Sequence, residues 1–192
     1  MDPMIICELA KCETEDRMSA NERLPDSIPR FRISNEQDSR ISSMSQAASS
    51  TFEEFIKRVA PENVMHFQNG LPGFPSDKRF VMVQNPEERP LVWLQSLDSP
   101  SLLFVATSPF TLFPDYRPNV PDHELAAIGS PSPEETLVLC ILRVIPLSTP
   151  ELHANLKAPV IINLRTLAAR QVIITNESMY SERAIYRVGS GE

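Results

Sequence analysis

From residue 51 onward, short apolar runs alternate with turn-forming residues. Pro, Asn, Asp or Ser bounds the runs, which is typical of short β-strands. The clearest runs are residues 80–83, 91–94, 102–105, 137–144, 160–162 and 172–174. Between residues 80 and 107 the connections are short and rich in turn residues, which favours antiparallel neighbours. The pattern predicts an all-β fold, a small antiparallel β-barrel-like domain over residues 51–188, followed by a C-terminal tail at 189–192.

One short helix is predicted within this domain, at residues 121–129. Asp122 is available as its N-cap, Leu125 and Ile128 lie on one helical face, and Gly129 provides a stop. We expect this helix to cover one end of the barrel. Eighteen prolines against five glycines argue against long helices elsewhere, because they indicate short elements interrupted by turns.

Residues 1–50 differ in composition from the rest of the chain. They hold six basic and nine acidic side chains with almost no periodic apolar pattern. Such a stretch buries too little apolar surface to offset the entropy lost on ordering, so we predict a disordered N-terminal extension. Two alternatives are a partner-binding tail and a start codon placed too early, with Met18 or Met44 as the true initiator.

The charge of the chain limits the choice of partners. A net charge of −7 argues against direct nucleic-acid binding, because phosphate contacts need clustered Lys and Arg. A basic protein partner fits better. The first residues carry no basic segment and a very short apolar run, so we expect neither a signal peptide nor a membrane span. Cys7, Cys12 and Cys140 are an odd number without a disulfide framework, which favours a reducing, cytoplasmic location.

The sequence offers little to a catalytic mechanism. His66, His123 and His153 show no metal-ligand spacing with Cys or Glu, so we expect no metal and no cofactor. No nucleophile elbow, phosphate loop or paired-carboxylate motif is present. Cys140 lies in an apolar run and is predicted to be a buried, unreactive thiol.

Gly70, Pro72, Gly73 and Phe74 belong to one compact loop. Glycine tolerates positive φ and proline holds φ near about −65°, so we predict a rigid turn with Phe74 packed beneath it. The alternative is an exposed recognition loop.

Four further positions have a predicted structural role. Trp93 lies in an apolar run and is assigned to the core. Asp98 precedes a Ser-Pro turn and is expected to accept backbone N–H bonds. Asn155 and Asn163 bracket an apolar run, where side-chain amides can tie strand ends to neighbouring loops. The same amides could instead pair with the exposed backbone of a partner.

Phe110, Phe113 and Tyr116 place three aromatic rings in a stretch that prolines interrupt at residues 109, 114 and 118. Such a segment is either a plug across a barrel end or a binding surface, because aromatic rings supply large contact areas at low entropic cost. If Tyr116 is buried, its hydroxyl needs a partner, which Asp115 or a backbone carbonyl could provide.

Several of these positions belong to five short motifs, which are recognised by their order along the chain and by the spacing between them. The motifs are GLPGF at 70–74, WLQSLD at 93–98, FPDY at 113–116, ANLKAPVIIN at 154–163 and QVII at 171–174, which opens with Gln171. Together they resemble the flagellar assembly factor FliW family over about residues 52–186. The resemblance implies a structural role for Gln171 and for the loop glycines.

The resemblance also implies a regulator and not an enzyme. Members of this family bind flagellin in the cytoplasm and antagonise the RNA-binding translational regulator CsrA, which relieves repression of flagellin translation. We therefore expect a monomer in which Phe110, Phe113, Asp115, Tyr116 and Asn155 lie at or beside a partner surface. The alternatives are a flagellin chaperone that does not contact CsrA, and a small-ligand-binding barrel or enzyme.

The segment around residues 52–59 gives conflicting signals. Phe52, Phe55, Ile56 and Val59 are spaced as on one face of a helix. The matching segment of the resembled family is a first strand, with Gly where this chain has Glu53. On the strength of the resemblance we expect an extended segment.

Overall fold

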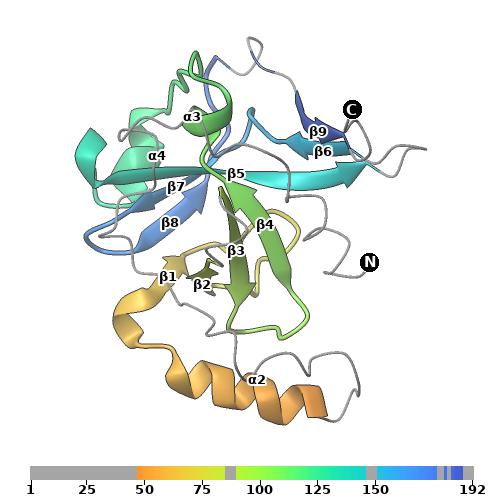
Figure 1. Ribbon diagram of the computed structural model, residues 1–192. Coiled ribbons are helices and arrows are strands. Elements are labelled where there is room, and N and C mark those ends of the chain that lie inside the picture. The colour runs from red at the N-terminus through yellow and green to blue at the C-terminus, as the bar shows by residue number, and fades with distance from the viewer. Residues whose placement is uncertain (1–46, 85–89, 146–150, 177–179, 181–182, 188–192) are drawn as a thin grey trace.

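The computed structural model describes residues 47–84, 90–145, 151–176, 180 and 183–187 (Figure 1). The predicted disordered extension therefore lies outside the described residues except for its last four positions, and the predicted tail at 189–192 lies wholly outside them. The strands are β1 Val64–Phe67, β2 Arg79–Val83, β3 Leu91–Ser96, β4 Leu103–Thr107, β5 Thr136–Ile145, β6 Glu151–Ala154, β7 Val160–Asn163, β8 Ala168–Gln171 and β9 Arg183–Arg187. The helices are α2 Ala47–Arg58, α3 Pro109–Leu112 and α4 Asp122–Ala127, with 3₁₀ turns at Pro61–Asn63 and Pro133–Glu135.

Seven strands form a closed barrel, which confirms the predicted fold class. Their order is β4-β3-β2-β1-β8-β7-β5, and pairing of β4 with β5 completes the ring. The pairs are antiparallel except β1 with β8, which run parallel with His66 opposite Ala168. Closure leaves the barrel strands without the unpaired edges that an open sheet presents.

Strand β5 belongs to the barrel and also extends beyond it. Its first part pairs with β7 over residues 136–139, and its last part pairs with β6 over residues 142–145. Strand β9 then adds to β6. Figure 1 shows this small three-stranded sheet projecting from the barrel at the far end of β5.

The barrel interior is packed with apolar side chains. Strand β5 illustrates the alternation, because Leu137 and Leu139 point inward whereas Val138 packs against clusters outside the barrel. The buried interior consists of Met65, Phe67, Leu71, Phe80, Met82, Val92, Leu94, Ala106, Leu137, Leu139, Val160, Ile162, Leu167 and Ala169. Phe67 and Phe80 make an edge-to-face ring contact with centroids 5.1 Å apart.

The prediction of an extended segment near residues 52–59 is wrong, because residues 52–58 belong to helix α2, which spans Ala47–Arg58, and Val59 follows directly after it. Phe55, Ile56 and Val59 pack against a cluster on the outer face of β2 and β3 that includes the buried Val81. The helical spacing of the apolar residues therefore matches their burial. In Figure 1 the helix lies across the bottom of the barrel.

Helix α4 confirms the predicted short helix but begins differently. Its N-cap is Pro121 and not Asp122, which is the first helical residue. Beyond the helix, Gly129 has φ of 86° and Ser130 N–H donates to the Leu125 carbonyl at 2.8 Å, an arrangement that satisfies the last turn. Ile128, which follows α4, packs with Ile161 of β7 and with Val172, the first residue after β8. The helix therefore covers the outside of the barrel at β7 and at the end of β8.

The strand predicted at residues 172–174 lies earlier in the sequence, at Ala168–Gln171. The last barrel strand, β8, ends at Gln171, and residues 172–174 continue past the sheet. Val172 and Ile174 are nevertheless buried, which explains the apolar run. Strands β1, β6 and β9 were not predicted, because each is short and mixes polar with apolar residues.

Candidate protein-binding surface

The aromatic loop, residues 108–118, begins where β4 leaves the barrel. Pro109 occupies the first turn of helix α3, where a missing N–H costs no hydrogen bond. The helix is short, and Phe113 N–H donates to the Pro109 carbonyl at 2.8 Å as it ends. Tyr116 N–H then donates to the Phe113 carbonyl at 2.9 Å, which folds the loop into a second turn.

Tyr116 anchors this loop in a second apolar cluster outside the barrel interior. Its side chain is 1% exposed and packs with Leu142, Leu156 and Cys140. The hydroxyl donates to the backbone carbonyl of Leu156 at 2.8 Å, so the partner is a carbonyl and not Asp115. Burial raises the pKa of the Tyr116 hydroxyl well above its usual value.

The outward side of the aromatic loop presents a different surface. Phe110 is 39% exposed, and its ring lies on that of Tyr116 with centroids 5.9 Å apart. Asp115 is exposed, and Phe113 is half-buried against the cluster around Tyr116. The loop has two sides, because Tyr116 and Phe113 pack into a cluster outside the barrel interior while Phe110 and Asp115 face solvent. It is therefore not a plug across a barrel end, and its role as a binding surface stays a prediction.

Asn155 lies close to this loop. The hydrogen bond from Tyr116 to Leu156 brings the turn after β6 against the aromatic loop. Asn155 Oδ1 accepts from Ala158 N–H at 3.2 Å, and its own N–H donates to the Ile141 carbonyl at 3.0 Å. The structure thus assembles all five predicted surface residues in one region, with Asn155 half-buried and holding a turn.

Residues of the C-terminal part also contact this loop and were not predicted. Arg117 N–H donates to the Tyr180 hydroxyl at 2.8 Å, and Asn119 N–H donates to Asn176 Oδ1 at 2.9 Å. The Tyr116 and Tyr180 rings meet edge to face at 4.8 Å. No periodicity or motif in the sequence links these segments, since contacts of this kind are set by the tertiary fold.

The loop at residues 70–74 is a tight turn, as predicted. Gly70 and Gly73 have φ of 67° and 87°, and Phe74 N–H donates to the Leu71 carbonyl at 2.7 Å. Phe74 does not pack beneath the turn, because 39% of it is exposed. Its ring rests edge-on against Phe104 at 5.4 Å, and Phe104 in turn packs against the apolar cluster of the barrel interior. Pro72 is exposed at the tip.

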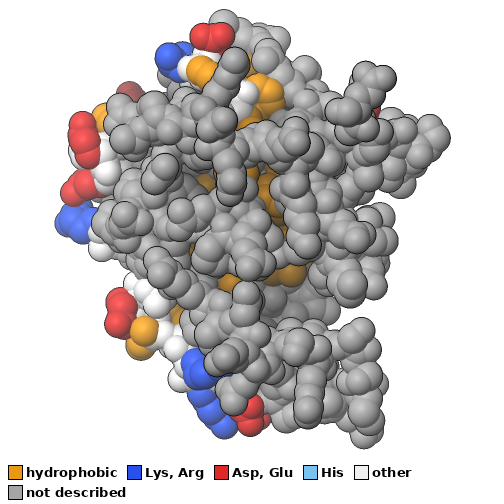
Figure 2. Space-filling view, viewed as in Figure 1, with side chains coloured by type: hydrophobic (Ala, Val, Ile, Leu, Met, Phe, Trp, Pro, Cys, Tyr) orange, Lys and Arg blue, Asp and Glu red, His pale blue; other side chains and the backbone are white. Residues whose placement is uncertain are grey.

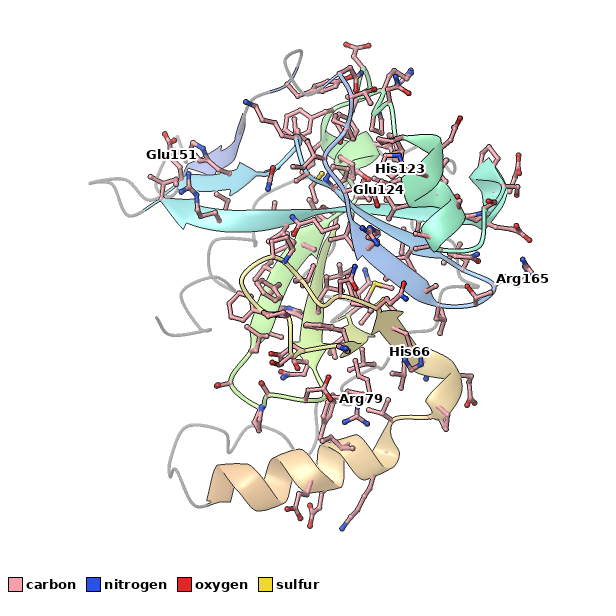
Figure 3. The ribbon with its side chains drawn as sticks, turned by 180° about the vertical axis from the view of Figure 1, so that it is seen from behind. His66, Arg79, His123, Glu124, Glu151 and Arg165 are labelled. Atoms are coloured by element: carbon pink, nitrogen blue, oxygen red, sulfur yellow. The ribbon has the colours of Figure 1, made fainter. Side chains whose placement is uncertain are left out.

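Asp98 accepts backbone hydrogen bonds as predicted, but from the neighbouring strand. Lys78 N–H and Arg79 N–H donate to Oδ2 at 2.7 and 2.9 Å, and Arg79 Nε donates to Oδ1 at 2.7 Å. Burial alone would raise the pKa of the Asp98 carboxyl, but these hydrogen bonds and the Arg79 charge together lower it. Figure 3 shows Arg79 on the side of the barrel that faces α2.

Trp93 is only partly buried, between the cluster around Tyr116 and the cluster beneath α2, so it is not an interior residue.

Asn163 is fully buried and ties three backbone groups together. Its Nδ2 donates to the Ile128 carbonyl at 2.8 Å, and its Oδ1 accepts from the N–H groups of Arg165 and Thr166. Gln171 Nε2 donates to the Ala158 carbonyl at 2.9 Å. Asn163 and Gln171 therefore serve the fold.

The ionisable groups do not converge on a reaction centre within the described ranges. His153 contacts Glu151 at 2.8 Å on the projecting sheet, whereas His66 and His123 are labelled on other elements in Figure 3. Among the described residues, no group of three or more His, Cys, Asp or Glu side chains is placed to hold a metal ion. Burial raises the pKa of the Cys140 thiol to about 12, which keeps it protonated and unreactive.

The described residues enclose a small pocket, and their charged side chains are mixed in sign. A pocket of about 30 Å³ between β1, β8 and α4 has room for about one water molecule. Beside it, Arg170 pairs with Glu124 of α4. On the face shown in Figure 2, acidic and basic side chains of the described residues lie near one another rather than in one large field of a single sign. In the described part of the chain, no helix is long and apolar enough to cross a membrane.

Comparison with known proteins gives a consistent result. The family model described as FliW protein matches residues 49–185. Flagellar assembly factor FliW of Caldicellulosiruptor saccharolyticus is 37% identical over 119 residues, which cover 62% of this chain and 77% of that protein. The factor of Symbiobacterium thermophilum is 41% identical over 117 residues, covering 60% and 84%. A crystal structure of the flagellar assembly factor FliW superposes with a TM-score of 0.59 and 30% identity, covering 70% of this chain and 92% of that one.

Proposed function

The chain belongs to the FliW family of flagellar assembly factors, and on that premise we propose that it is a non-catalytic regulator that binds two proteins. The proposed partners are flagellin and the RNA-binding translational regulator CsrA, both met in the cytoplasm. By occupying CsrA, the protein relieves repression of flagellin translation. Accumulated flagellin then occupies the protein and frees CsrA again.

The observation that carries this proposal is the form of the aromatic loop. Phe110 is exposed but its ring is supported by the buried Tyr116, and Asp115 lies exposed nearby. An aromatic side chain held in place by packing loses little entropy when a partner covers it, which is typical of residues that dominate binding energy. The adjacent carboxylate provides a contact for a basic partner.

The net charge supports the basic partner of this proposed pair. The net charge of −7 attracts a basic RNA-binding protein and speeds its encounter with this chain. A switch between two ligands also requires that each weakens the binding of the other by the same factor. Overlap of both ligands on the aromatic loop would produce this reciprocity in the simplest way.

A binding competition tests the proposal. The full chain is titrated calorimetrically with CsrA of the same organism, first alone and then after saturation with flagellin. We expect micromolar or tighter binding of CsrA that flagellin abolishes, and the reverse order of addition should give the same coupling. Retained flagellin binding without CsrA binding would instead identify a flagellin chaperone.

A hidden ligand site in the barrel is the less favoured function. The interior is filled by apolar side chains such as Met65, Leu94 and Ile162, whereas small-molecule sites are concave and combine apolar walls with convergent polar groups. The pocket of about 30 Å³ is far below the volume such ligands need.

A further inference from the structure

The segment that follows β8 runs beside the end of the aromatic loop. Thr175 N–H donates to the Asn119 carbonyl at 2.8 Å, and the Thr175 hydroxyl contacts the same oxygen at 3.2 Å. Asn176 uses both ends of its amide, since Oδ1 accepts from Asn119 N–H and Nδ2 donates to the Arg117 carbonyl, each at 2.9 Å. The backbone of Thr175 and the side chains of Thr175 and Asn176 thus pair with the backbone of residues 117 and 119 as a neighbouring strand would.

Tyr180 completes this arrangement with a single hydroxyl. It accepts from Arg117 N–H at 2.8 Å and donates to the Arg117 carbonyl at 3.1 Å, so both backbone groups of one residue are held by one side chain. The Tyr180 ring is 9% exposed and meets the buried Tyr116 edge to face. Three rings therefore lie in series, from the exposed Phe110 through Tyr116 to Tyr180.

The hydrogen bonds between Tyr180 and Arg117 lie at the end of the aromatic loop, next to its exposed residues. Arg117 is two residues beyond Asp115 and adjacent to Tyr116, so its backbone fixes the exit of the aromatic loop. The entrance is already fixed by β4 and by Pro109 at the start of α3. Without the Tyr180 hydroxyl, the backbone of Arg117 would lose two hydrogen bonds and keep the one that its carbonyl accepts from Asn176 Nδ2.

We propose that Tyr180 is a positioning residue of the partner-binding surface, which holds the aromatic loop in the conformation that presents Phe110 and Asp115. The inference rests on the proposed function, because it concerns the same surface. It adds that the C-terminal segment acts in binding without touching the partner. Pre-organisation of this kind lowers the entropic cost of association and so raises affinity.

The test compares Tyr180→Phe with the intact chain. Phenylalanine keeps the ring beside Tyr116 but removes the hydroxyl, so the loss is confined to the two hydrogen bonds at Arg117. Val81→Ala, beneath α2 on the outer face of β2, serves as a control that lowers stability at a site remote from the loop. Two quantities are measured on each protein, namely amide hydrogen exchange of Arg117 and the affinity for CsrA and flagellin.

In Tyr180→Phe we expect the Arg117 amide to exchange roughly tenfold faster or more, while barrel amides such as that of Leu94 keep their protection relative to global stability. The affinity for at least one partner should fall by roughly three- to tenfold. Val81→Ala should leave both the Arg117 exchange, corrected for stability, and the affinities unchanged.

Two results would overturn the inference. Unchanged exchange at Arg117 would show that the hydroxyl does not hold the loop, and faster exchange with unchanged affinity would show that the held conformation does not matter for binding. Failure of the proposed function is seen separately, because the unmodified chain would then bind neither partner. In that case the role of Tyr180 in binding fails with it.

Discussion

Gly70 occupies a position that no other residue fits. Its φ is 67°, and a Cβ built there would lie 2.3 Å from the Phe74 carbonyl oxygen and 2.8 Å from Pro75 Cα. We expect Gly70→Ala to lower the free energy of unfolding by roughly 3 kcal/mol, since the strained φ and the backbone clash add together. Urea unfolding monitored by Trp93 fluorescence measures this as a shift of the midpoint.

Gly73 in the same turn provides the matched control. Its φ is 87°, but a Cβ there would meet no atom within 4 Å. Gly73→Ala should therefore cost only about 1–2 kcal/mol, the strain of the positive φ alone. Equal losses in both variants would contradict the steric explanation for Gly70.

Asp98 makes stability depend on pH in acid. Its pKa in the folded state is lowered, so its contribution is complete at pH values above the unfolded pKa near 3.8 and is lost as pH falls through the folded pKa. We expect Asp98→Asn to cost about 1 kcal/mol at pH 7, a modest value because the side chain is partly open to solvent. The difference between the two proteins should shrink below about pH 4 in unfolding curves measured across pH. A stability difference between the two proteins that stays constant down to pH 2 would show that the charge of the Asp98 carboxylate is not the source of the stabilisation.

Asp115 is the residue at which charge is expected to decide partner binding. Asp115→Lys should weaken CsrA binding by roughly tenfold, because an attractive contact becomes repulsive at the aromatic loop. Glu62→Lys changes the charge equally at an exposed site in the turn before β1 and should have a smaller effect. Calorimetry at several salt concentrations tests this, and an unchanged affinity of Asp115→Lys across that series would exclude the loop as the CsrA interface.

Side-chain chemistry made part of this region predictable. A buried tyrosine needs a hydroxyl partner and an Asp before a Ser-Pro turn seeks backbone N–H groups, and both expectations hold for Tyr116 and Asp98. The contacts of Tyr180 could not be predicted, because they join segments more than sixty positions apart through one hydroxyl. The position of Phe74 was predicted wrongly, because the sequence does not reveal that its ring lies against Phe104 while staying partly exposed.

Among the elements, helix α2 depends on its packing. A helix of this length is marginal alone in water, so its stability derives from the apolar residues it sets against β2 and β3. Ile56→Ala should lower the free energy of unfolding by about 1–2 kcal/mol, since the side chain is half-buried, whereas Lys57→Ala on the exposed side should change it by less than about 0.5 kcal/mol. Chemical unfolding with circular dichroism compares the two, and similar losses would mean that the helix is not docked as described.

The strands show where local pattern suffices and where it does not. Runs rich in Val, Ile and Leu identified the cores of β2, β3, β4, β5 and β7. Strand β8 has the sequence AARQ, which carries no strand preference, and it is extended because β1 and β7 flank it on both sides. In α2 the helical spacing alone was correct, and the resemblance to a family with a strand there was misleading.

At the scale of the whole molecule, net charge governs association more than folding. A chain of net charge −7 should bind a basic partner with a rate constant that falls steeply as salt rises, because screening shortens the reach of the field. We expect the association rate with CsrA to drop roughly tenfold between 50 and 500 mM salt in stopped-flow experiments, with a smaller change in dissociation. An association rate that does not depend on salt would assign recognition to apolar contacts alone.

The parallel pairing of β1 with β8 has a consequence for how the protein is made. These strands meet at residues 66 and 168, so the barrel stays open during synthesis until the ribosome has released most of the chain. Pairings this distant in sequence are also slow to form. A newly made molecule therefore acquires a finished barrel only after translation is nearly complete, and its own folding sets a minimum delay before it can bind any partner that recognises the folded domain.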